Sequence, residues 1–229
     1  MKLVMLDIDG TLTQSYEYDQ EVFARAIADV TNRPRISTNL NDYAYTSSRG
    51  VTEEAIRQLT GRTPGEQELK EVERRVLWHL ERMYAESPAT FSQVPGADHF
   101  LKRLRRLDGL GTAIATGCWH SEALFKLGAS GLRVDGIPMA TSDDDRDRQR
   151  IMEIALQRAR DHYACPEFER IVYIGDGLWD LQASRALGFA FVGVGSRLQA
   201  LKDAGVIRLH ADYIQLEVVF ASIAAALEG

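Results

Sequence analysis

The sequence contains few cysteines and no long apolar run. Its only cysteines, Cys118 and Cys165, lie too far apart to form a short metal-binding motif. We therefore expect two free thiols in a reducing cytoplasm, and a core large enough to need no disulfide. No stretch approaches the ~20 apolar residues that cross a bilayer. Asp7 interrupts the first apolar run too early for a signal peptide. With neither a spanning run nor a signal peptide in the sequence, we expect no membrane partner.

The chain also lacks a basic tract. Its 27 Lys and Arg residues are outnumbered by 33 Asp and Glu residues, which gives a net charge of −6. Nucleic acid is therefore not an expected partner, although a local arrangement of positive charge can still attract an anionic substrate. The 45% of hydrophobic and 26% of charged residues are typical of a globular protein with one large domain, or a domain and a smaller companion. The oligomeric state is left open.

Four short apolar runs have the character of buried strands. They cover residues 3–8, 112–115, 171–174 and 189–194. Helical patterns lie between and around them, over residues 97–107, 121–127 and 147–160. Strands that alternate with helices, and that are apolar along their length, are typical of a parallel sheet covered on both faces. The predicted fold class is therefore α/β, with a Rossmann-like parallel sheet as its core.

Residues 15–91 contain no convincing strand pattern. Helical patterns occupy residues 18–31, 52–59 and 65–85, and loops rich in serine, glycine and proline separate them. The acidic residues after Thr52 suit the first turn of a helix. We predict an all-helical domain at 15–91, inserted into an α/β core formed by residues 1–14 and 92–229.

Carboxylates follow several of the predicted strands. Asp7 and Asp9 end the first, Thr116-Gly117 follows the second, and Asp176 with Asp180 follows the third. Because the carboxyl ends of parallel strands meet at one edge of the sheet, we expect these groups to converge there. Residues i and i+2 of a strand share a face, so Asp7 and Asp9 would point the same way. Such like charges coexist when a cation lies between them or when one carries a proton.

This set of groups suits phosphate chemistry. Hard oxygen ligands are those that Mg²⁺ prefers, and the ion commonly uses one or two carboxylates together with substrate phosphate. The Thr116 hydroxyl and nearby backbone N–H groups could hold phosphate oxygens. One aspartate could attack phosphorus as the nucleophile, and a second could protonate the leaving group.

The order and spacing of these motifs resemble the haloacid dehalogenase superfamily over essentially the whole chain. Asp7-Ile8-Asp9-Gly10-Thr11 is similar to its first motif, Thr116-Gly117 to its second, and Gly175-Asp176-Gly177-x-x-Asp180 to its fourth. The resemblance implies a phosphatase-like enzyme with Mg²⁺ as cofactor, and a helical (C1-type) cap at residues 15–91.

The resemblance also implies a role for each matched residue. Asp7 would be the nucleophile and a metal ligand. Asp9 would be the general acid/base, with its backbone carbonyl on the metal. Asp176 would be a further metal ligand, and Asp180 a supporting carboxylate.

The third motif departs from the family pattern, which usually has a lysine just before a helix. Residues 142–151 contain no lysine. Arg148, after Asp147 as a candidate N-cap, is the preferred phosphate-binding replacement, and Arg146 is the alternative. A guanidinium can hold phosphate through two hydrogen bonds, so arginine is physically adequate. Thr116 and Gly117 would complete the phosphate-binding groups.

Two residues outside these motifs carry separate expectations. Arg49 lies between predicted cap helices, and in capped relatives a comparable loop faces the active site and helps to select the substrate. The alternative is a solvated loop arginine. Cys118 has no neighbour that marks it as a nucleophile, so we expect it to be a small buried residue.

The second aspartate narrows the reaction that the resemblance implies. Family members that act on carbon–halogen or carbon–phosphorus bonds usually lack it, so Asp9 favours phosphate esters. We expect Mg²⁺-dependent hydrolysis of a small phosphorylated metabolite, similar to that of phosphoglycolate phosphatase. The alternatives are a sugar phosphomutase of the same superfamily and a non-catalytic protein that binds a phosphorylated ligand.

Overall fold

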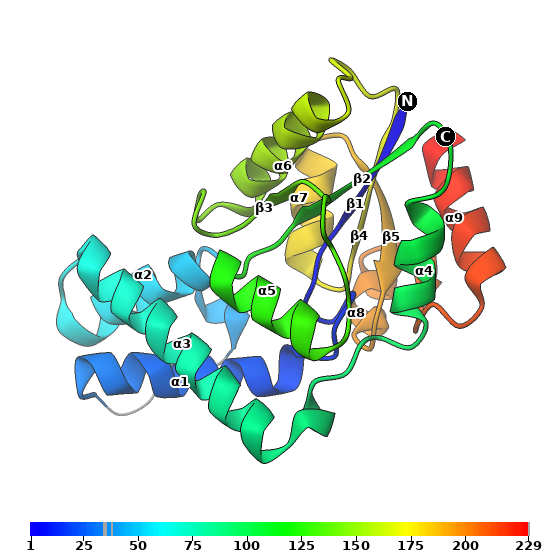
Figure 1. Ribbon diagram of the computed structural model, residues 1–229. Helices are drawn as coiled ribbons and strands as arrows, with labels where there is room; N and C mark the ends of the chain where they lie inside the picture. The colour runs from blue at the N-terminus through cyan, green and yellow to red at the C-terminus, as the bar shows by residue number, and fades with distance from the viewer. Residues whose placement is uncertain (34–35, 38, 229) are drawn as a thin grey trace.

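The computed structural model describes residues 1–33, 36–37 and 39–228, and a six-stranded parallel sheet forms its centre (Figure 1). The strand order is β3-β2-β1-β4-β5-β6. The strands are β1 (Lys2–Leu6), β2 (Leu110–Ala115), β3 (Met139–Ala140), β4 (Ile171–Gly175), β5 (Ala190–Val194) and β6 (Leu209–His210). Because β1 pairs with β2 on one side and with β4 on the other, the residues that follow β1 lie at the middle of the sheet edge.

The four predicted apolar runs correspond to β1, β2, β4 and β5. The edge strands β3 and β6 were not predicted, because a strand of two residues carries no periodic pattern. The remaining core elements are helices α4 (Ala97–Leu104), α5 (His120–Ala129), α6 (Arg148–His162), α7 (Leu178–Ala186), α8 (Leu198–Asp203) and α9 (Leu216–Glu228). None of the helices in the described parts of the chain is long and apolar enough to cross a membrane.

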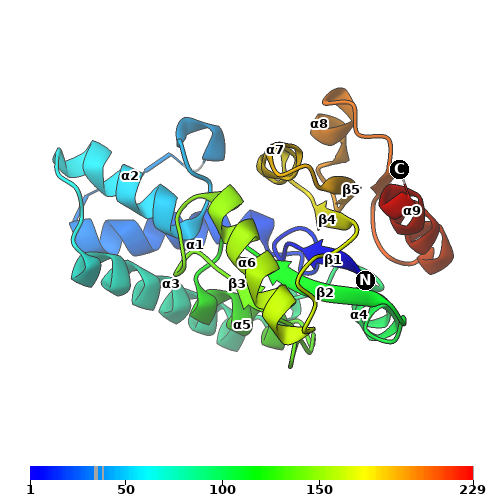
Figure 2. The same cartoon turned by 90° about the horizontal axis from the view of Figure 1, so that it is seen from above.

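Helices cover both faces of the sheet (Figure 2). Val4 and Leu6 of β1 pack into one apolar cluster with residues of α4, α5 and α9. Leu3 and Met5 point the other way, into a second cluster with residues of α6 and α7. This alternation explains why the strand is apolar along its length, and it confirms the α/β class with a Rossmann-like sheet.

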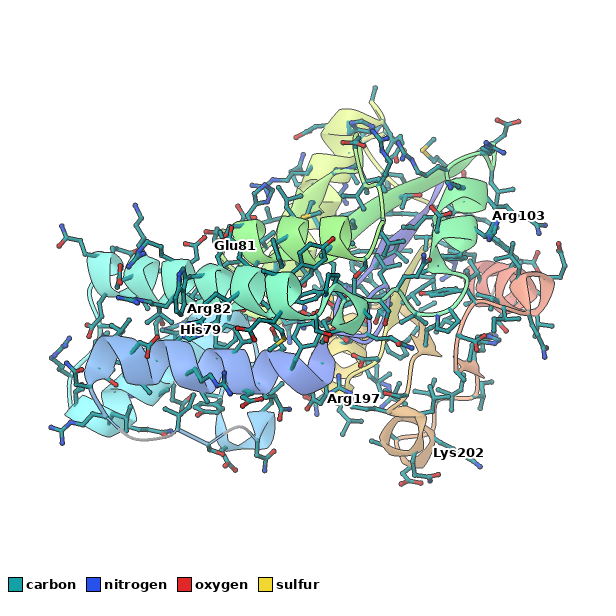
Figure 3. All side chains as sticks on the ribbon, turned by 60° about the horizontal axis from the view of Figure 1, so that its bottom comes forward. His79, Glu81, Arg82, Arg103, Arg197 and Lys202 are labelled. Carbon is teal, nitrogen blue, oxygen red and sulfur yellow. The ribbon has the colours of Figure 1, made fainter. Side chains whose placement is uncertain are left out.

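The helices that lie between β1 and α4 in the sequence form a unit beside the sheet. It contains α1 (Tyr16–Thr31), α2 (Ser48–Thr60), α3 (Glu66–Glu86) and two short 3₁₀ helices, η1 (Leu40–Asp42) and η2 (Pro88–Thr90). Figure 1 shows α1, α2 and α3 together at the lower left, away from the sheet. Ile27 of α1, Ile56 of α2 and Leu80 of α3 are fully buried in a core of their own. His79 of α3 faces α1, where its Nε2 lies 2.8 Å from Asp29 (Figure 3).

The chain leaves and re-enters the sheet domain through two adjacent segments. The Gln14 N–H donates to the Ser92 carbonyl at 2.8 Å. This contact lies at both predicted domain boundaries, so we infer that residues 15–91 are a cap domain. Trp119 at the start of α5 connects cap and core, because its ring stacks on that of Phe23 in α1 with centroids 5.4 Å apart.

Helix α2 begins about one turn before its predicted start at Thr52. Ser47 is the N-cap, since its hydroxyl accepts a hydrogen bond from the Gly50 N–H at 3.2 Å. Glycine disfavours helix and gave this segment the character of a loop. However, a Cβ at Gly50 would lie 2.3 Å from Tyr45 Cβ. Close packing therefore explains the glycine, and Thr52 is buried inside the helix.

Candidate active site

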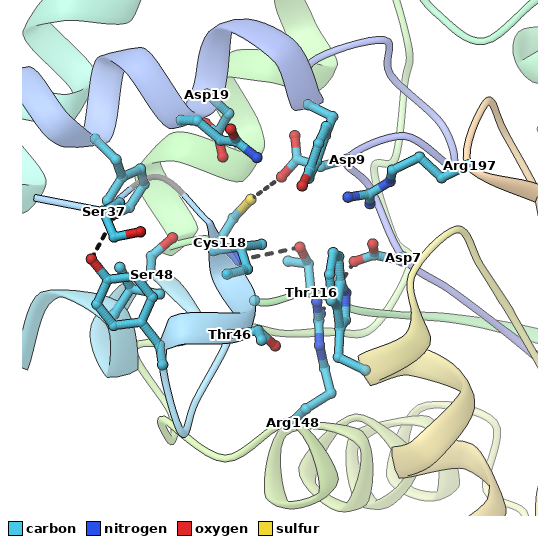
Figure 4. Close-up of a pocket in the computed structure, with 18 of the residues that line it drawn as sticks. Asp7, Asp9, Asp19, Ser37, Thr46, Ser48, Thr116, Cys118, Arg148 and Arg197 are labelled. Atoms are coloured by element: carbon cyan, nitrogen blue, oxygen red, sulfur yellow. Dashed lines mark hydrogen bonds and ion pairs between the residues drawn. The ribbon is translucent and has the colours of Figure 1, made fainter. Parts of the chain in front are cut away.

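A pocket lies beyond the carboxyl ends of β1 and β2, between the sheet domain and the cap (Figure 4). Its core side is lined by Asp7, Asp9, Thr116, Gly117, Cys118, Arg148, Trp179 and Arg197. Its cap side is lined by Tyr16, Asp19, Gln20, Phe23, Ile36, Ser37, Leu40, Tyr43, Thr46, Ser48 and Val51. Five of the predicted site residues therefore share one pocket.

Asp7 follows β1 directly and is almost fully buried. Its Oδ1 accepts a hydrogen bond from Arg148 Nη1 at 3.2 Å. Burial raises the pKa of Asp7 to about 7 and Asp180 adds to the rise, whereas the charge of Arg148 opposes it. Because β1 ends at Leu6, the alternation of strand faces does not extend to Asp7 and Asp9. The two residues line the same pocket but have different partners.

Asp9 is surrounded by hydrogen-bond donors. Its carboxylate accepts hydrogen bonds from Ser15, from the Cys118 thiol and from Lys126, whose Nζ lies 3.0 Å from Oδ1. Burial alone would raise the pKa of Asp9, but the charge of Lys126 and these hydrogen bonds outweigh it and lower the pKa. Asp9 is therefore held in its charged form.

Asp176 and Asp180, which follow β4, bring two more carboxylates to Asp7. One oxygen from each of the three lies within 4.8 Å of the others. Burial raises the pKa of Asp176 to about 7 and that of Asp180 to about 6. Asp176 Oδ1 is buried and has no hydrogen-bond partner among the described residues. An unpaired buried oxygen costs free energy, and such a set of oxygen donors suits a hard cation such as Mg²⁺.

Arg197, which follows β5, is a cation at this acidic cluster. Its Nη2 donates to Asp176 Oδ2 at 2.6 Å. The guanidinium contacts two aromatic rings, with Cζ 3.4 Å from the Tyr16 centroid and 4.6 Å from that of Trp179. Figure 3 shows Arg197 beside the N-terminal end of α1. It was not predicted, although its place after a predicted strand is the signal that could have identified it.

Arg148 begins α6, and the side chain of Asp147 caps this helix as predicted. The helix start directs the Arg148 guanidinium at Asp7, and the side chain is only 10% exposed. Arg146 is 51% exposed and pairs with Glu53 of α2 at 2.8 Å. The geometry therefore favours Arg148 over Arg146 as the cation of the third motif.

Thr116 and Gly117 form the turn after β2 where the core approaches α2. The Gly117 carbonyl accepts a hydrogen bond from the Ser48 N–H at 2.7 Å. A Cβ at Gly117 would lie 3.1 Å from Ser47 Cα and 3.2 Å from Arg148 Nη2. Glycine therefore allows cap, core and the guanidinium to meet at this turn. Thr116 is buried at the same place.

Arg49 does not line the pocket. Its guanidinium pairs with Glu53 at 2.9 Å and with Glu66 of α3. The segment that resembled a loop is the first turn of α2, which directs Arg49 toward α3. Thr46 and Ser48, its neighbours in the sequence, line the pocket instead.

A buried cluster around Lys126 of α5 was also missing from the predicted site. Lys126 Nζ lies 2.6 Å from Glu122 Oε1 and also contacts Asp19 of α1. Burial alone would lower the pKa of Lys126, but the surrounding carboxylates outweigh it and raise the pKa well above its usual value. Cys118 is buried as expected, yet it also contacts Asp9. A helical lysine is normally solvated, so only its spacing four residues after Glu122 hinted at this cluster.

Several solved structures resemble this chain. A hydrolase from Pseudomonas syringae matches with a TM-score of 0.69 and 22% identity, over 94% of this chain and 97% of that one. CbbY from Rhodobacter sphaeroides, in complex with phosphate, matches with a TM-score of 0.62 and 19% identity, over 93% of this chain and 95% of that one. A predicted phosphoglycolate phosphatase from Haemophilus somnus 129PT matches with a TM-score of 0.57 and 20% identity, over 96% of this chain and 98% of that one. At these identities the likeness shows the fold alone, and no curated protein matches the sequence.

A sequence model of one protein family matches most of the chain. It is that of the haloacid dehalogenase-like hydrolases, and it covers residues 1–188. The matched region contains the Asp7–Asp9 motif, the turn after β2 and the Asp176–Asp180 motif. This protein therefore belongs to the haloacid dehalogenase-like hydrolases.

Proposed function

We propose that the protein hydrolyses a phosphate monoester of a small metabolite through an aspartyl phosphate on Asp7. The observation that carries the proposal is the presence of Asp7 and Asp9 in one pocket, with Arg148 3.2 Å from the Asp7 carboxylate. Phosphoryl transfer through an enzyme carboxylate needs a nucleophile, a proton carrier and a fixed positive charge. Asp7, Asp9 and Arg148 would supply these groups.

In the first step, Asp7 attacks phosphorus in line with the departing ester oxygen. We assign the equatorial phosphate oxygens to the Arg148 guanidinium, the Thr116 hydroxyl and the Gly117 N–H, which belong to residues that line the pocket. Asp9 protonates the leaving oxygen. The bound phosphate is a like charge that raises the pKa of Asp9, so that Asp9 can take up the proton it donates.

In the second step, water opens the aspartyl phosphate. The water oxygen bonds to phosphorus, the bond from Asp7 to phosphorus breaks, and Asp9 accepts the water proton. The donors around Asp9 that lower its pKa favour this base form. Inorganic phosphate then leaves and Asp7 is restored.

We propose Mg²⁺ as the cofactor, held by Asp7, Asp176 and the backbone carbonyl of Asp9, with Asp180 in support. The residues fit this ion, because the donors are hard oxygens and Asp176 Oδ1 is buried without a partner. When bound, the ion would supply positive charge to offset that of the carboxylates and the phosphate.

We propose that the cap selects the leaving group. Its side of the pocket combines apolar side chains, such as Phe23 and Val51, with the hydroxyls of Thr46 and Ser48. This lining suits a small metabolite that is partly apolar and carries hydrogen-bonding groups. The metabolite would be cytoplasmic, as expected for the protein itself.

A phosphate-release assay tests the proposal. Purified protein with Mg²⁺ is assayed against phosphoglycolate, sugar phosphates and nucleotides, beside the variant Asp7→Asn. We expect release from at least one ester by the wild-type protein and none by the variant. Conversion of a sugar phosphate to its isomer without net release would favour a mutase. Binding of an ester without any turnover would favour a non-catalytic protein.

A further inference from the structure

Lys126 connects the carboxylate of Asp9 to the cap. It lies on α5 of the core and is fully buried. Its Nζ lies 3.0 Å from Asp9 Oδ1 and 2.6 Å from Glu122 Oε1, and it donates a hydrogen bond to Asp19 of α1. Figure 4 shows Asp9 and Asp19 on the same side of the pocket.

Glu122 carries a second link between core and cap. Its Oε1 holds Lys126, and its Oε2 accepts a hydrogen bond from the Ser48 hydroxyl of α2 at 3.0 Å. Oε2 also accepts one from the Trp119 N–H at 3.2 Å, which fixes the carboxylate to the start of α5. Helices α1 and α2 of the cap thus reach the cluster through Asp19 and Ser48. A displacement of the cap would break both contacts.

Stability alone does not account for a lysine at this position. A buried ion pair often stabilises a protein no more than apolar residues of similar volume do. The neighbouring buried residues of α5, Ala123 and Leu127, pack in the apolar core, so the helix itself does not require a charge. Asp9, Glu122 and Cys118 have the spacing of metal ligands, but the ammonium of Lys126 lies among them. Lys126 is therefore the cation of a cluster that contains a site carboxylate.

We propose that Lys126 is a positioning residue that holds the Asp9 carboxylate in place for the second chemical step while the cap is docked. This inference rests on the proposed function, in which Asp9 accepts a proton from the attacking water. When the cap moves away, Asp19 and Ser48 leave the cluster, and Asp9 loses the arrangement that they support. Hydrolysis of the aspartyl phosphate then takes place only while the cap is docked, in a site from which bulk water is excluded.

The test separates the two chemical steps with p-nitrophenyl phosphate, whose leaving group departs without a proton. In Lys126→Met the first step should proceed and the second should be slow. We expect a burst of about one p-nitrophenolate per active site, followed by turnover about 100-fold slower than in the wild type. Lys126→Arg should recover part of the lost rate. Lys102→Met, at an exposed lysine of α4 that pairs with Asp98, is the matched control and should show wild-type kinetics.

Wild-type kinetics in Lys126→Met, or slow turnover without a burst, would overturn the inference. Asp19→Asn tests the cap link separately and serves also if Lys126→Met does not fold. It should give a burst and turnover about 10-fold slower, at the low end of what a misplaced base costs, and wild-type kinetics there would overturn the coupling to the cap. Failure of the proposed function has another signature, namely a wild-type protein that releases no phosphate or an Asp7→Asn variant of equal activity.

Discussion

Arg197 Nη2 lies 2.6 Å from Asp176 Oδ2, which places a cation of the protein at the carboxylates that we propose as the metal site. The other oxygen of Asp176, Oδ1, has no hydrogen-bond partner among the described residues. Asp176 thus offers one oxygen to the arginine and leaves the second for an ion. The arginine charge should weaken the attraction of this site for a metal.

Arg197→Met should therefore tighten metal binding. We expect the Kd for Mn²⁺, measured by isothermal titration calorimetry, to fall about tenfold, which corresponds to ~1.4 kcal/mol. Arg185→Met, at an exposed arginine of α7, should leave the Kd unchanged. Equal or weaker affinity in Arg197→Met would show that the arginine supports the metal site instead of competing with it.

Arg148→Met should lower kcat/KM about 100-fold, because it removes a charge that we assign to the transferred phosphoryl group. Arg148→Lys should lose less, since it keeps the charge but not the paired hydrogen bonds. Arg146→Met is the matched control, two residues away and paired with Glu53 of the cap. Thermal unfolding checks that the variants are folded. Equal losses in Arg146→Met and Arg148→Met would contradict the assignment of the third motif.

Two glycines separate the effect of backbone conformation from that of close packing. Gly10 has a φ of 75° and Gly61 a φ of 77°, so alanine is strained at both. A Cβ at Gly10 would lie 1.8 Å from Asp176 Oδ2, whereas nothing lies within 4 Å of one at Gly61. Gly61→Ala should cost about 1 kcal/mol of unfolding free energy. Gly10→Ala should cost several-fold more unfolding free energy, or displace Asp176 and weaken metal binding. Equal losses of unfolding free energy in the two variants, measured by urea denaturation, together with unchanged metal binding, would refute this prediction.

The metal-free protein should lose stability as the pH rises from about 4 to about 7. Burial raises the folded-state pKa of Asp176 to about 7 from a usual 3.8, so the folded state keeps a proton that the unfolded state loses. This contribution is complete below the unfolded pKa and absent above the folded one. The unfolding free energy of the wild type relative to Asp176→Asn should fall by on the order of 2–4 kcal/mol between about pH 4 and 8. Urea denaturation in EDTA measures the difference, and a value that rises with pH would refute the prediction.

The sequence predicted the parts of the fold that depend on local pattern. The central strands are apolar because both faces are covered, and Asp147 has the chemistry of an N-cap, so both could be identified. The two-residue strands β3 and β6 have no pattern of their own. The predicted start of α2 was wrong by about one turn, because Gly50 was interpreted as a loop residue. Its close packing against Tyr45 explains the glycine, and no local sequence pattern reveals that packing.

The site divides in the same way. Asp7, Asp9 and Arg148 could be placed because each stands at the end of a strand or the start of a helix, and such ends meet at one edge of the sheet. Lys126 is brought to Asp9, across 117 residues of sequence, by the packing of α5 on the sheet, where its buried residues share an apolar cluster with those of β1. Arg49 has a side chain suited to binding an anionic substrate, but the first turn of α2 directs it toward Glu66.

The central claim is that Asp7 carries the phosphoryl group. A rapid-quench experiment with a radiolabelled phosphate ester, followed by peptide mapping, tests it most directly. We predict a label on the peptide that contains Asp7 in the wild-type protein, its accumulation in Lys126→Met, and its absence in Asp7→Asn. Phosphate release with no label on that peptide at any quench time, and at an undiminished rate in Asp7→Asn, would contradict the account.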